Sequence, residues 1–207
     1  MISDRRLDRM RAVLEQRLVH VRCAIEAVHH RHNVSAILRT CDALGVHRVD
    51  LVSHERFKVS PGAARGAERW LDLKTHDDPT IAIQNIQADG YRVYVADLSD
   101  DAVEPRGVPL DRPACLWFGA EHAGVSEAAT AAADGVVMLP MRGFAQSLNV
   151  SVAAALVLSQ VADRARSLHD ALLSEEERQA TLHAWLAREK VVEAHIAARN
   201  ELPRTLE

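Results

Sequence analysis

The stretch HNVSAILRTCDALGVHRVDLV, residues 32–52, joins a helix pattern directly to a strand pattern. A helix is predicted from about Val34 to Leu44, because Gly45 follows in the position of a helix C-cap. The run from Val46 to Val52 is then a strand. A helix that leads into a strand is the unit from which α/β folds are built, so this stretch indicates the fold class.

The same alternation continues on the C-terminal side. Pro79 begins a predicted helix to about Ala88, and a β-rich run from Tyr91 to Ala96 follows Gly90. Farther along we expect a strand at Ala114–Phe118, a helix capped by Ser126 through Ala133, a strand at Val136–Leu139 and an alanine-rich helix from Leu148 to about Ala165. Strands that alternate with helices predict an α/β fold with a mostly parallel sheet flanked by helices.

The two ends of the chain add helices. Residues 4–28 have apolar positions near helical spacing, which predicts one amphipathic helix or two short ones. Near the other end, Ser174 followed by three glutamates is typical of a helix start, so we expect a helical tail. The expected organisation is one domain at residues 20–166, a basic helical extension at 1–19 and a second helical extension at 167–207.

Composition excludes several classes of protein. With 207 residues, 48% of them hydrophobic and 26% charged, the chain has an ordinary globular composition and can bury a full core. Its longest uncharged apolar stretch, residues 150–158, is too short to cross a bilayer, and the charged N-terminus lacks the apolar region of a secretory signal. We therefore expect a cytoplasmic protein without a membrane role. Cys23, Cys41 and Cys115 have no paired spacing and are expected as core thiols.

Charge is distributed unevenly. A net charge of −4 argues against a protein that coats nucleic acid nonspecifically, but residues 1–31 hold seven arginines against four acidic residues, a local charge of +3. This arm could contact phosphates, and the candidate RNA-binding residues are Arg5, Arg6, Arg9 and Arg11. The alternative is a solvated helix face, which most charge runs are.

Three segments carry polar residues and glycines where an α/β core needs none. In the first, residues 32–40, Asn33 is a good helix N-cap, and Ser35 and Arg39 are four residues apart on one helix face. A guanidinium on that face could bind a phosphate or ribose oxygen. The alternative for Arg39 is a surface salt bridge.

The second segment, LWFGAEHAGVS at residues 116–126, runs from a strand into glycines. It is not a phosphate loop, because Val125 follows Gly124 where that motif requires lysine, and no G-x-G-x-x-G spacing occurs in the chain. Gly119 instead suits a close backbone approach to a ligand at the carboxyl end of a strand. The alternative is a tight turn that needs a positive φ.

The third segment, MLPMRGFAQSLNVS at residues 138–151, leaves a strand through Pro140. A loop containing Gly143 follows, and Ser147 stands just before a helix whose first N–H groups have no partner within the helix. Such a loop can hold the edge of an adenosine.

Taken in this order, the three segments resemble the tRNA (guanosine-2′-O) methyltransferases of the SPOUT superfamily. The matching strings are HNVSAILRTCDALG at 32–45, FGAEHAGVS at 118–126 with AADG at 132–135, and LPM at 139–141 with QSLNVSVAA at 146–154. The resemblance covers about residues 20–165. It implies a SPOUT fold in which the C-terminal part forms a deep trefoil knot, a rare exception among folds. It also implies an obligate homodimer, with residues of one subunit completing the site of the other.

The resemblance also implies site residues. Asn33, Arg39, Glu121, Ser147 and Asn149 match the polar residues of the family motifs and are the candidate catalytic residues. The pocket for the methyl donor, S-adenosylmethionine, is expected to consist mostly of backbone at Ala96, Gly119, Leu139, Met141 and Leu148. Because a guanidinium is effectively always charged, we expect Arg39 to orient the ribose hydroxyl and stabilise the developing alkoxide rather than act as the base.

The expected reaction is methyl transfer to the ribose 2′-hydroxyl of a tRNA guanosine, most specifically the D-loop guanosine at position 18. Departures from the family pattern at residues 142–145 and at Glu68-Arg69 could alter the RNA target. The alternatives are therefore the same chemistry on ribosomal RNA or on another tRNA nucleotide, and a noncatalytic RNA-binding dimer. A Rossmann-type small-molecule methyltransferase is disfavoured by the missing glycine-rich turn. No metal is expected, because the neighbouring histidines at 29, 30 and 32 lack ligand spacing.

Overall fold

The computed structural model describes residues 2–28, 30–53, 66–121 and 123–201. Within these ranges the chain divides into two compact units. One extends from Leu18 to Leu172, and the other combines the residues before Leu18 with those from Leu173 onward. Residues 60–66, where a proline and two glycines predict a loop from the sequence, lie outside the described residues except for Gly66.

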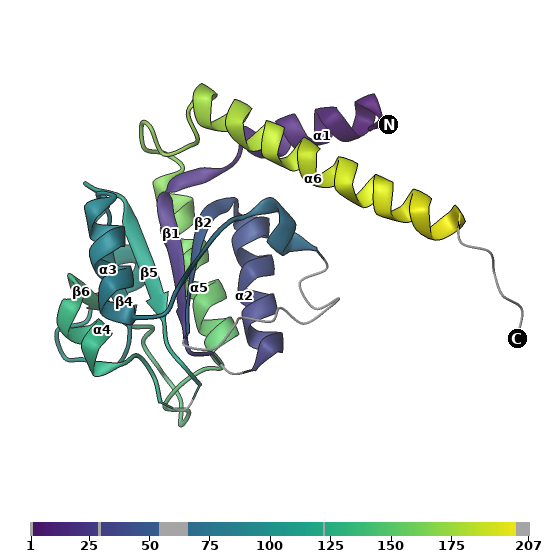
Figure 1. Ribbon diagram of the computed structural model, residues 1–207. Helices are drawn as coiled ribbons and strands as arrows, with labels where there is room; N and C mark the ends of the chain where they lie inside the picture. Colours follow the sequence, from purple (N-terminus) through teal and green to yellow (C-terminus); the bar gives the residue numbers. More distant parts are fainter. Residues whose placement is uncertain (1, 29, 54–65, 122, 202–207) are drawn as a thin grey trace, which may run out of the picture. The chain divides into compact units, whose positions relative to one another are not determined.

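The larger unit is built on a six-stranded sheet in which every paired strand is parallel (Figure 1). The strand order is β3-β2-β1-β5-β4-β6. The strands are β1 (Leu18–Glu26), β2 (Val46–Val52), β3 (Asp72–His76), β4 (Arg92–Ala96), β5 (Ala114–Phe118) and β6 (Gly135–Val137). The predicted α/β fold with a parallel sheet is confirmed.

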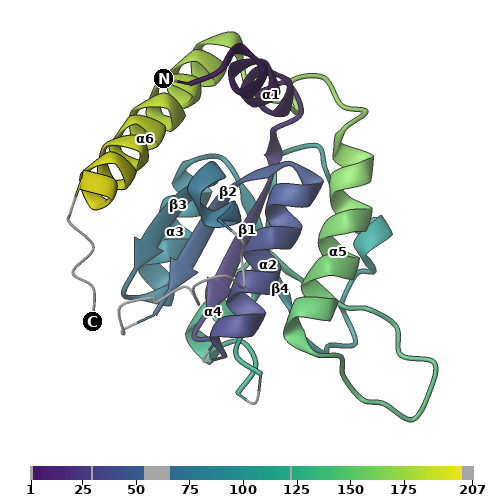
Figure 2. The ribbon, with the colours of Figure 1, turned by 90° about the vertical axis from the view of Figure 1, so that its right-hand side faces the viewer.

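Helices cover both faces of this sheet (Figures 1 and 2). Helices α2 (Arg31–Leu44) and α5 (Val150–Ala165) lie on one face, and α3 (Pro79–Ala88) and α4 (Glu127–Ala132) on the other. Short 3₁₀ helices occur at η1 (Ala67–Trp70) and η2 (Pro105–Gly107). Each face has its own buried cluster, with Leu38 and Leu158 in the first and Ile83 and Trp117 in the second.

Most predicted elements are confirmed, with small shifts at their ends. Gly45 has a left-handed φ of 75° and ends α2 as its C-cap, as predicted. Ser126 accepts a hydrogen bond from the Ala129 N–H and caps α4. Strand β6 ends at Val137, two residues earlier than predicted, and α5 begins at Val150 rather than Leu148. The segment between them is therefore a longer loop than the sequence indicated.

The three cysteines are free and buried, as expected, and burial raises the pKa of the Cys23 and Cys115 thiols.

The prediction of helix throughout residues 4–28 was wrong. Helix α1 (Asp4–Leu14) ends early, and residues 18–26 form β1 between β2 and β5 near the middle of the sheet. A strand buried on both faces has a nearly continuous apolar sequence instead of a simple alternation. Arg22 and Glu26 interrupt that run four residues apart, which imitates the polar face of a helix. Strand β3 was also missed, because it is short and largely polar.

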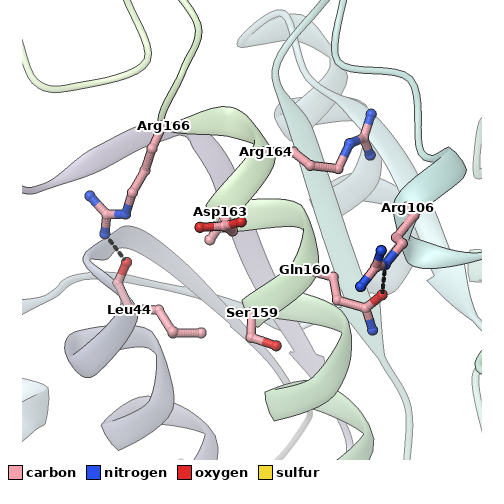
Figure 3. A pocket seen from close by; sticks show the side chains of 8 residues that line it. Leu44, Arg106, Ser159, Gln160, Asp163, Arg164 and Arg166 are labelled. Atoms are coloured by element: carbon pink, nitrogen blue, oxygen red, sulfur yellow. Dashed lines mark hydrogen bonds between the residues drawn. The ribbon is translucent and has the colours of Figure 1, made fainter.

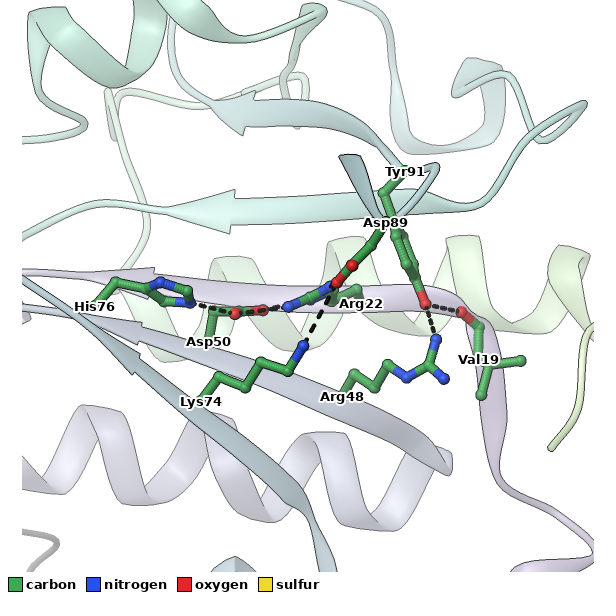
Figure 4. Close-up of polar contacts among 8 residues, drawn as sticks. All are labelled: Val19, Arg22, Arg48, Asp50, Lys74, His76, Asp89 and Tyr91. Carbon is green, nitrogen blue, oxygen red and sulfur yellow. Dashed lines mark hydrogen bonds and ion pairs between the residues drawn. The ribbon is translucent and has the colours of Figure 1, made fainter. Parts of the chain in front are cut away.

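Arg22 is buried within a polar network between β1, β2 and β3 (Figure 4). Its guanidinium donates two hydrogen bonds to Asp50 and one to Asp89, and His76 Nε2 lies 2.7 Å from Asp50 Oδ1. Burial alone would lower the pKa of Arg22, but the hydrogen bonds and charge of Asp50, together with Asp89, raise it above its ordinary value. The network pairs the buried guanidinium of Arg22 with the buried side chain of Asp50.

The smaller unit contains α1 and α6 (Glu175–Glu201). Its buried side chains include Met10, Leu14, Leu182 and Trp185. Ser174 begins α6 with a reciprocal capping box: its Oγ accepts from the Glu177 N–H, and the Glu177 carboxylate accepts from the Ser174 N–H. The predicted helix start at Ser174 is confirmed. Across the described residues, no helix combines the length and apolarity that a membrane span requires.

Candidate active site

A cavity of about 630 Å³ opens where β4, β5 and β6 end. All five residues predicted for the donor pocket line it: Ala96, Gly119, Leu139, Met141 and Leu148. Three of the five candidate catalytic residues, Glu121, Ser147 and Asn149, also line it. Its volume and mixed lining are those of a site for a small organic ligand. Segments far apart in sequence therefore meet at the edge of the sheet where α/β proteins bind ligands.

Gly119 has no room for a side chain. A Cβ built on it would lie 2.1 Å from the carbonyl oxygen of Gly124. The approach is this close because the loop folds back on itself, with Ala120 and Gly124 exchanging two N–H···O bonds of 2.9 Å. Gly119 is not among the residues with positive φ, so the alternative of a left-handed turn at this position was wrong. The glycine is required by contact with the loop backbone.

One side of the cavity is lined by Leu139, Met141, Gln146, Ser147 and Leu148. In the described chain, no N–H or C=O of these residues has a hydrogen-bond partner. Backbone groups in such a setting bond to water or to a ligand. Backbone donors and acceptors without protein partners, together with the apolar residues Leu139, Met141 and Leu148, suit a planar heterocycle such as adenine, which needs both.

A chain of side-chain hydrogen bonds crosses the rim of the cavity. Asn33 Nδ2 donates to Glu121 Oε1 at 2.8 Å, and Asn149 Nδ2 donates to Asn33 Oδ1 at 3.2 Å. Asn149 Oδ1 in turn accepts from the Ser151 hydroxyl and caps α5. The chain links α2, the loop after β5 and the start of α5. Three of the predicted polar residues are thus brought together.

Asn33 was predicted as the N-cap of its helix, and this was wrong. Helix α2 begins at Arg31 with His30 at the cap position, so Asn33 lies in the first turn, and its side chain is available for Glu121. Burial acts to raise the pKa of Glu121. Hydrogen bonds from Asn33 and from backbone N–H groups, with the charge of His30, outweigh it and hold that pKa below its ordinary value. Glu121 is therefore a carboxylate at neutral pH.

Arg39 and Ser147 are placed differently. Arg39 is exposed on α2, does not line the cavity and forms no ion pair with any described residue, which removes the salt-bridge alternative within that part of the chain. Ser35 was expected to share its face but is fully buried, so the two side chains do not form one surface. Ser147 is exposed at the cavity wall.

The arginines of α1, predicted as RNA-binding residues, lie in the other unit. Arg6 contacts Glu189 at 3.5 Å, Arg11 contacts Asp8 at 3.8 Å, and Arg5 and Arg9 are exposed.

Sequence reasoning missed two parts of the larger unit. Asp97, Leu98 and Gln146 also line the cavity, and the position of Asp97 directly after β4 is a signal that could have found it.

A second cavity of about 530 Å³ lies beside the last turns of α5 (Figure 3). Its lining includes Arg106, Arg164 and Arg166. Arg106 donates to Gln160, Arg164 to the Pro105 and Val108 carbonyls, and Arg166 to the Leu44 carbonyl.

Comparison with known proteins decides the family. The model of the SpoU rRNA methylase family matches residues 20–159, about two thirds of the chain. The chain belongs to the SpoU rRNA methylase family. Among relatives of this SpoU family member, the tRNA (guanosine(18)-2′-O)-methyltransferase of Thermus thermophilus is 40% identical over 192 residues, which cover 89% of this chain and 97% of the relative.

Solved structures agree with this assignment. The TrmH/SpoU tRNA modifying enzyme of Aquifex aeolicus superposes on the SpoU family member with a TM-score of 0.81 at 33% identity, covering 90% of this chain and 97% of the other. The SpoU methyltransferase AviRb of Streptomyces viridochromogenes, in complex with the cofactor AdoMet, superposes with a TM-score of 0.63 at 25% identity, covering 75% and 60%. The unpaired backbone groups of the lining residues Leu139, Met141 and Leu148 fit such a cofactor, whose adenine needs both donors and acceptors.

Proposed function

We propose that this protein transfers a methyl group from S-adenosylmethionine to the ribose 2′-hydroxyl of guanosine in tRNA, and that its target is the D-loop guanosine at position 18. The observation that carries the proposal is the cavity in which Leu139, Met141 and Leu148 meet Gly119 and Ala96. The tRNA substrate is supported by the 40% identity with a relative that bears this activity in its name. We place the protein in the cytoplasm together with that substrate.

Each candidate residue has a defined task in this reaction. The bound donor supplies an electrophilic methyl group on a positively charged sulfur. Arg39 orients the ribose hydroxyl and the neighbouring phosphate and stabilises the negative charge that develops on the oxygen. The proton passes to a phosphate oxygen or to water. Asn33, Glu121 and Asn149 hold the rim of the cavity through their hydrogen bonds, and Ser147 contacts the nucleotide at the wall. Positioning supplies most of the rate.

The active protein is a homodimer in this proposal. Arg39 is exposed and does not line the cavity of its own chain, which is the arrangement expected if it completes the site of a second subunit. An apolar surface is available for that contact. It consists of Phe144, Leu148, Val152 and Leu156, all exposed along the cavity loop and α5. Val152 and Leu156 have spacing i, i+4 on α5, and exposed apolar residues at this spacing are typical of a helix face that is buried in an interface.

The C-terminal part of residues 20–166, the proposed methyltransferase domain, forms a trefoil knot in this proposal. Two observations support threading of the chain here. Strand β6 is flanked by β4 on one side and by Val103 on the other, so the segment after β4 passes outside it. The chain then crosses from β6 to α5, which packs on the opposite face against α2 and β1.

RNA contacts are proposed for two sets of arginines. The first set, Arg5, Arg6, Arg9 and Arg11, lies on α1 in the basic extension at 1–19. The second, Arg106, Arg164 and Arg166, lines the second cavity. Exposed guanidinium groups bind phosphates in fork geometry and position RNA without reading its sequence. The helical extension at 167–207 is proposed to support the first set, since α1 and α6 belong to one unit.

The test is transfer of labelled methyl groups from S-adenosylmethionine to bulk tRNA transcripts, with the modified nucleotide mapped by resistance of its 3′ linkage to alkali. Arg39→Ala should lower kcat by about 10²- to 10³-fold and leave donor affinity unchanged, since only the stabilisation of the developing charge is lost. Arg31→Ala, an exposed arginine at the start of the same helix, is the control.

Label at the D-loop guanosine that disappears with Arg39→Ala supports both substrate and role. Label on ribosomal RNA alone keeps the chemistry and moves the target. Donor binding without transfer to any RNA would leave the noncatalytic dimer as the better description.

A further inference from the structure

Glu26 is a buried carboxylate that does not line the donor cavity. It is the last residue of β1, and only 6% of it is exposed. Its Oε2 accepts two hydrogen bonds, from Trp117 Nε1 at 2.7 Å and from the backbone N–H of Ser126 at 3.3 Å. One oxygen atom therefore joins β1 to β5 and to the cap of α4.

The two donors bracket the loop that forms one side of the cavity. Trp117 stands just before Gly119, and Ser126 follows the loop, whose residues Gly119, Ala120 and Glu121 line the cavity. Holding both ends of the loop on a single oxygen fixes the distance between them. With its ends held at this distance, the loop folds back on itself, and Ala120 and Gly124 exchange their two hydrogen bonds.

The path into α2 begins directly after Glu26. Ala27, directly after Glu26, has a left-handed φ of 48°, which is uncommon for a residue other than glycine. Its N–H donates to the Val52 carbonyl at 2.9 Å. The chain then turns into α2, where Asn33 donates to Glu121 of the bracketed loop. The loop is thus held from two directions, and both supports begin at the end of β1.

We propose that Glu26 is a positioning residue for the methyl donor, which acts by holding the Gly119–Ser126 loop in the shape that the donor requires. The inference rests on the proposed function for the identity of the ligand. Strained or tightly held backbone near a site persists because surrounding contacts over-determine it. Here the buried Glu26 carboxylate and its two donors are those contacts.

Two substitutions separate acceptor geometry from charge. Glu26→Gln keeps an oxygen that can accept both hydrogen bonds, whereas Glu26→Leu removes the acceptor and leaves the buried Trp117 N–H without a partner. Trp117→Phe removes one of the two bonds and serves as a second, milder variant. Ile83→Ala is the matched control, because Ile83 is fully buried in the same cluster as Trp117 but outside the cavity lining.

The experiment uses the full-length protein and measures binding of S-adenosylhomocysteine by calorimetry, steady-state KM for donor and for tRNA, and thermal unfolding. Glu26→Leu should weaken donor binding about tenfold or more, the scale of a lost buried hydrogen bond, with KM for tRNA nearly unchanged. Glu26→Gln should restore most of the affinity, and Trp117→Phe should lie between them. Hydrogen exchange should rise at residues 119–125 in Glu26→Leu and not in Ile83→Ala.

Unchanged donor affinity in Glu26→Leu overturns the inference, as does an equal loss in the equally destabilised Ile83→Ala. If Glu26→Leu does not fold, Trp117→Phe decides: donor affinity that stays at the wild-type value overturns the inference, and a selective loss supports it. Failure of the wild-type protein to bind S-adenosylhomocysteine would instead overturn the proposed function, and this inference with it.

Discussion

Gly119 illustrates how a single residue determines the shape of the candidate site. A Cβ at this position would overlap the Gly124 carbonyl. Gly119→Ala must therefore displace the loop backbone and disturb the paired hydrogen bonds between Ala120 and Gly124. We expect this variant to lose donor binding by about tenfold or more and to unfold at lower temperature, since backbone offers no easy relaxation.

Gly143 provides the control for this prediction, because nothing lies within 4 Å of a Cβ built there and its φ is not positive. Gly143→Ala should retain donor affinity and stability. Calorimetric titration with S-adenosylhomocysteine and thermal unfolding measure both effects. Equal behaviour of the two variants would show that the close contact at Gly119 does not shape the pocket.

At this scale the lining of the cavity was predictable and the polar rim was only partly so. The family resemblance placed Ala96, Gly119 and Leu139 in the predicted pocket, and all three line the cavity. Ala96 ends β4 and Gly119 follows β5, and such strand ends can be found from sequence. The partner of Asn33 could not be found that way. The bond from Asn33 to Glu121 joins residues 88 apart, and it depends on α2 beginning two residues before Asn33, where local capping signals favoured a later start.

Strand β1 is the element on which sequence reasoning failed. Strands β2 and β5 pair with its two edges and helices cover its two faces, and none of these neighbours is visible in a local window. Arg22 looked like a solvated residue, yet it is paired with Asp50, which is 28 residues away. Elements with a local signal, such as the glycine cap of α2 or the capping box of α6, were predicted correctly.

The Arg22 network yields a prediction about pH. The hydrogen bond from Arg22, with the nearby Lys74, lowers the pKa of Asp89 below its ordinary value. A carboxyl with a lowered pKa in the folded state adds stability above the unfolded pKa of about 3.9, and loses it as pH falls through the folded pKa. Asp89 is nearly half exposed, so solvent screening keeps its contribution below about 1 kcal/mol.

Asp89→Asn should therefore unfold at a temperature lower than the wild type by at most about 2–4 °C. The difference should be the same at pH 7 and pH 5 and should shrink only below about pH 4. Thermal unfolding across this range measures it, with wild type and variant in matched salt. A difference that disappears between pH 7 and pH 5 would assign the effect to another titrating group.

At the scale of the whole molecule, the proposed dimer makes a clear prediction. Val152 and Leu156 are 47% and 43% exposed on α5, one turn apart. A charge placed in a buried apolar interface is not compensated, so Leu156→Glu should convert a dimer into monomers and abolish methyl transfer. Ile81→Glu is the control: Ile81 is 57% exposed on α3, away from this surface. Light scattering after gel filtration gives the masses, and a Leu156→Glu protein that stays dimeric contradicts the proposed surface.

The second cavity leads to a prediction about how RNA is held. Exposed arginines that contact phosphates release counterions, so each contact contributes about 0.7 to 0.9 to the slope of log affinity against log salt. Arg106→Ala removes a guanidinium that lines this cavity and donates to Gln160. It should raise KM for tRNA about three- to tenfold and reduce that slope by about one, with kcat and donor affinity unchanged. Arg112→Ala, an exposed arginine that lines neither cavity, should change neither quantity. Filter binding of tRNA over a series of salt concentrations measures the slopes. If Arg106→Ala retains the wild-type slope, tRNA does not contact this cavity, and the arginines of α1 would remain the proposed phosphate contacts.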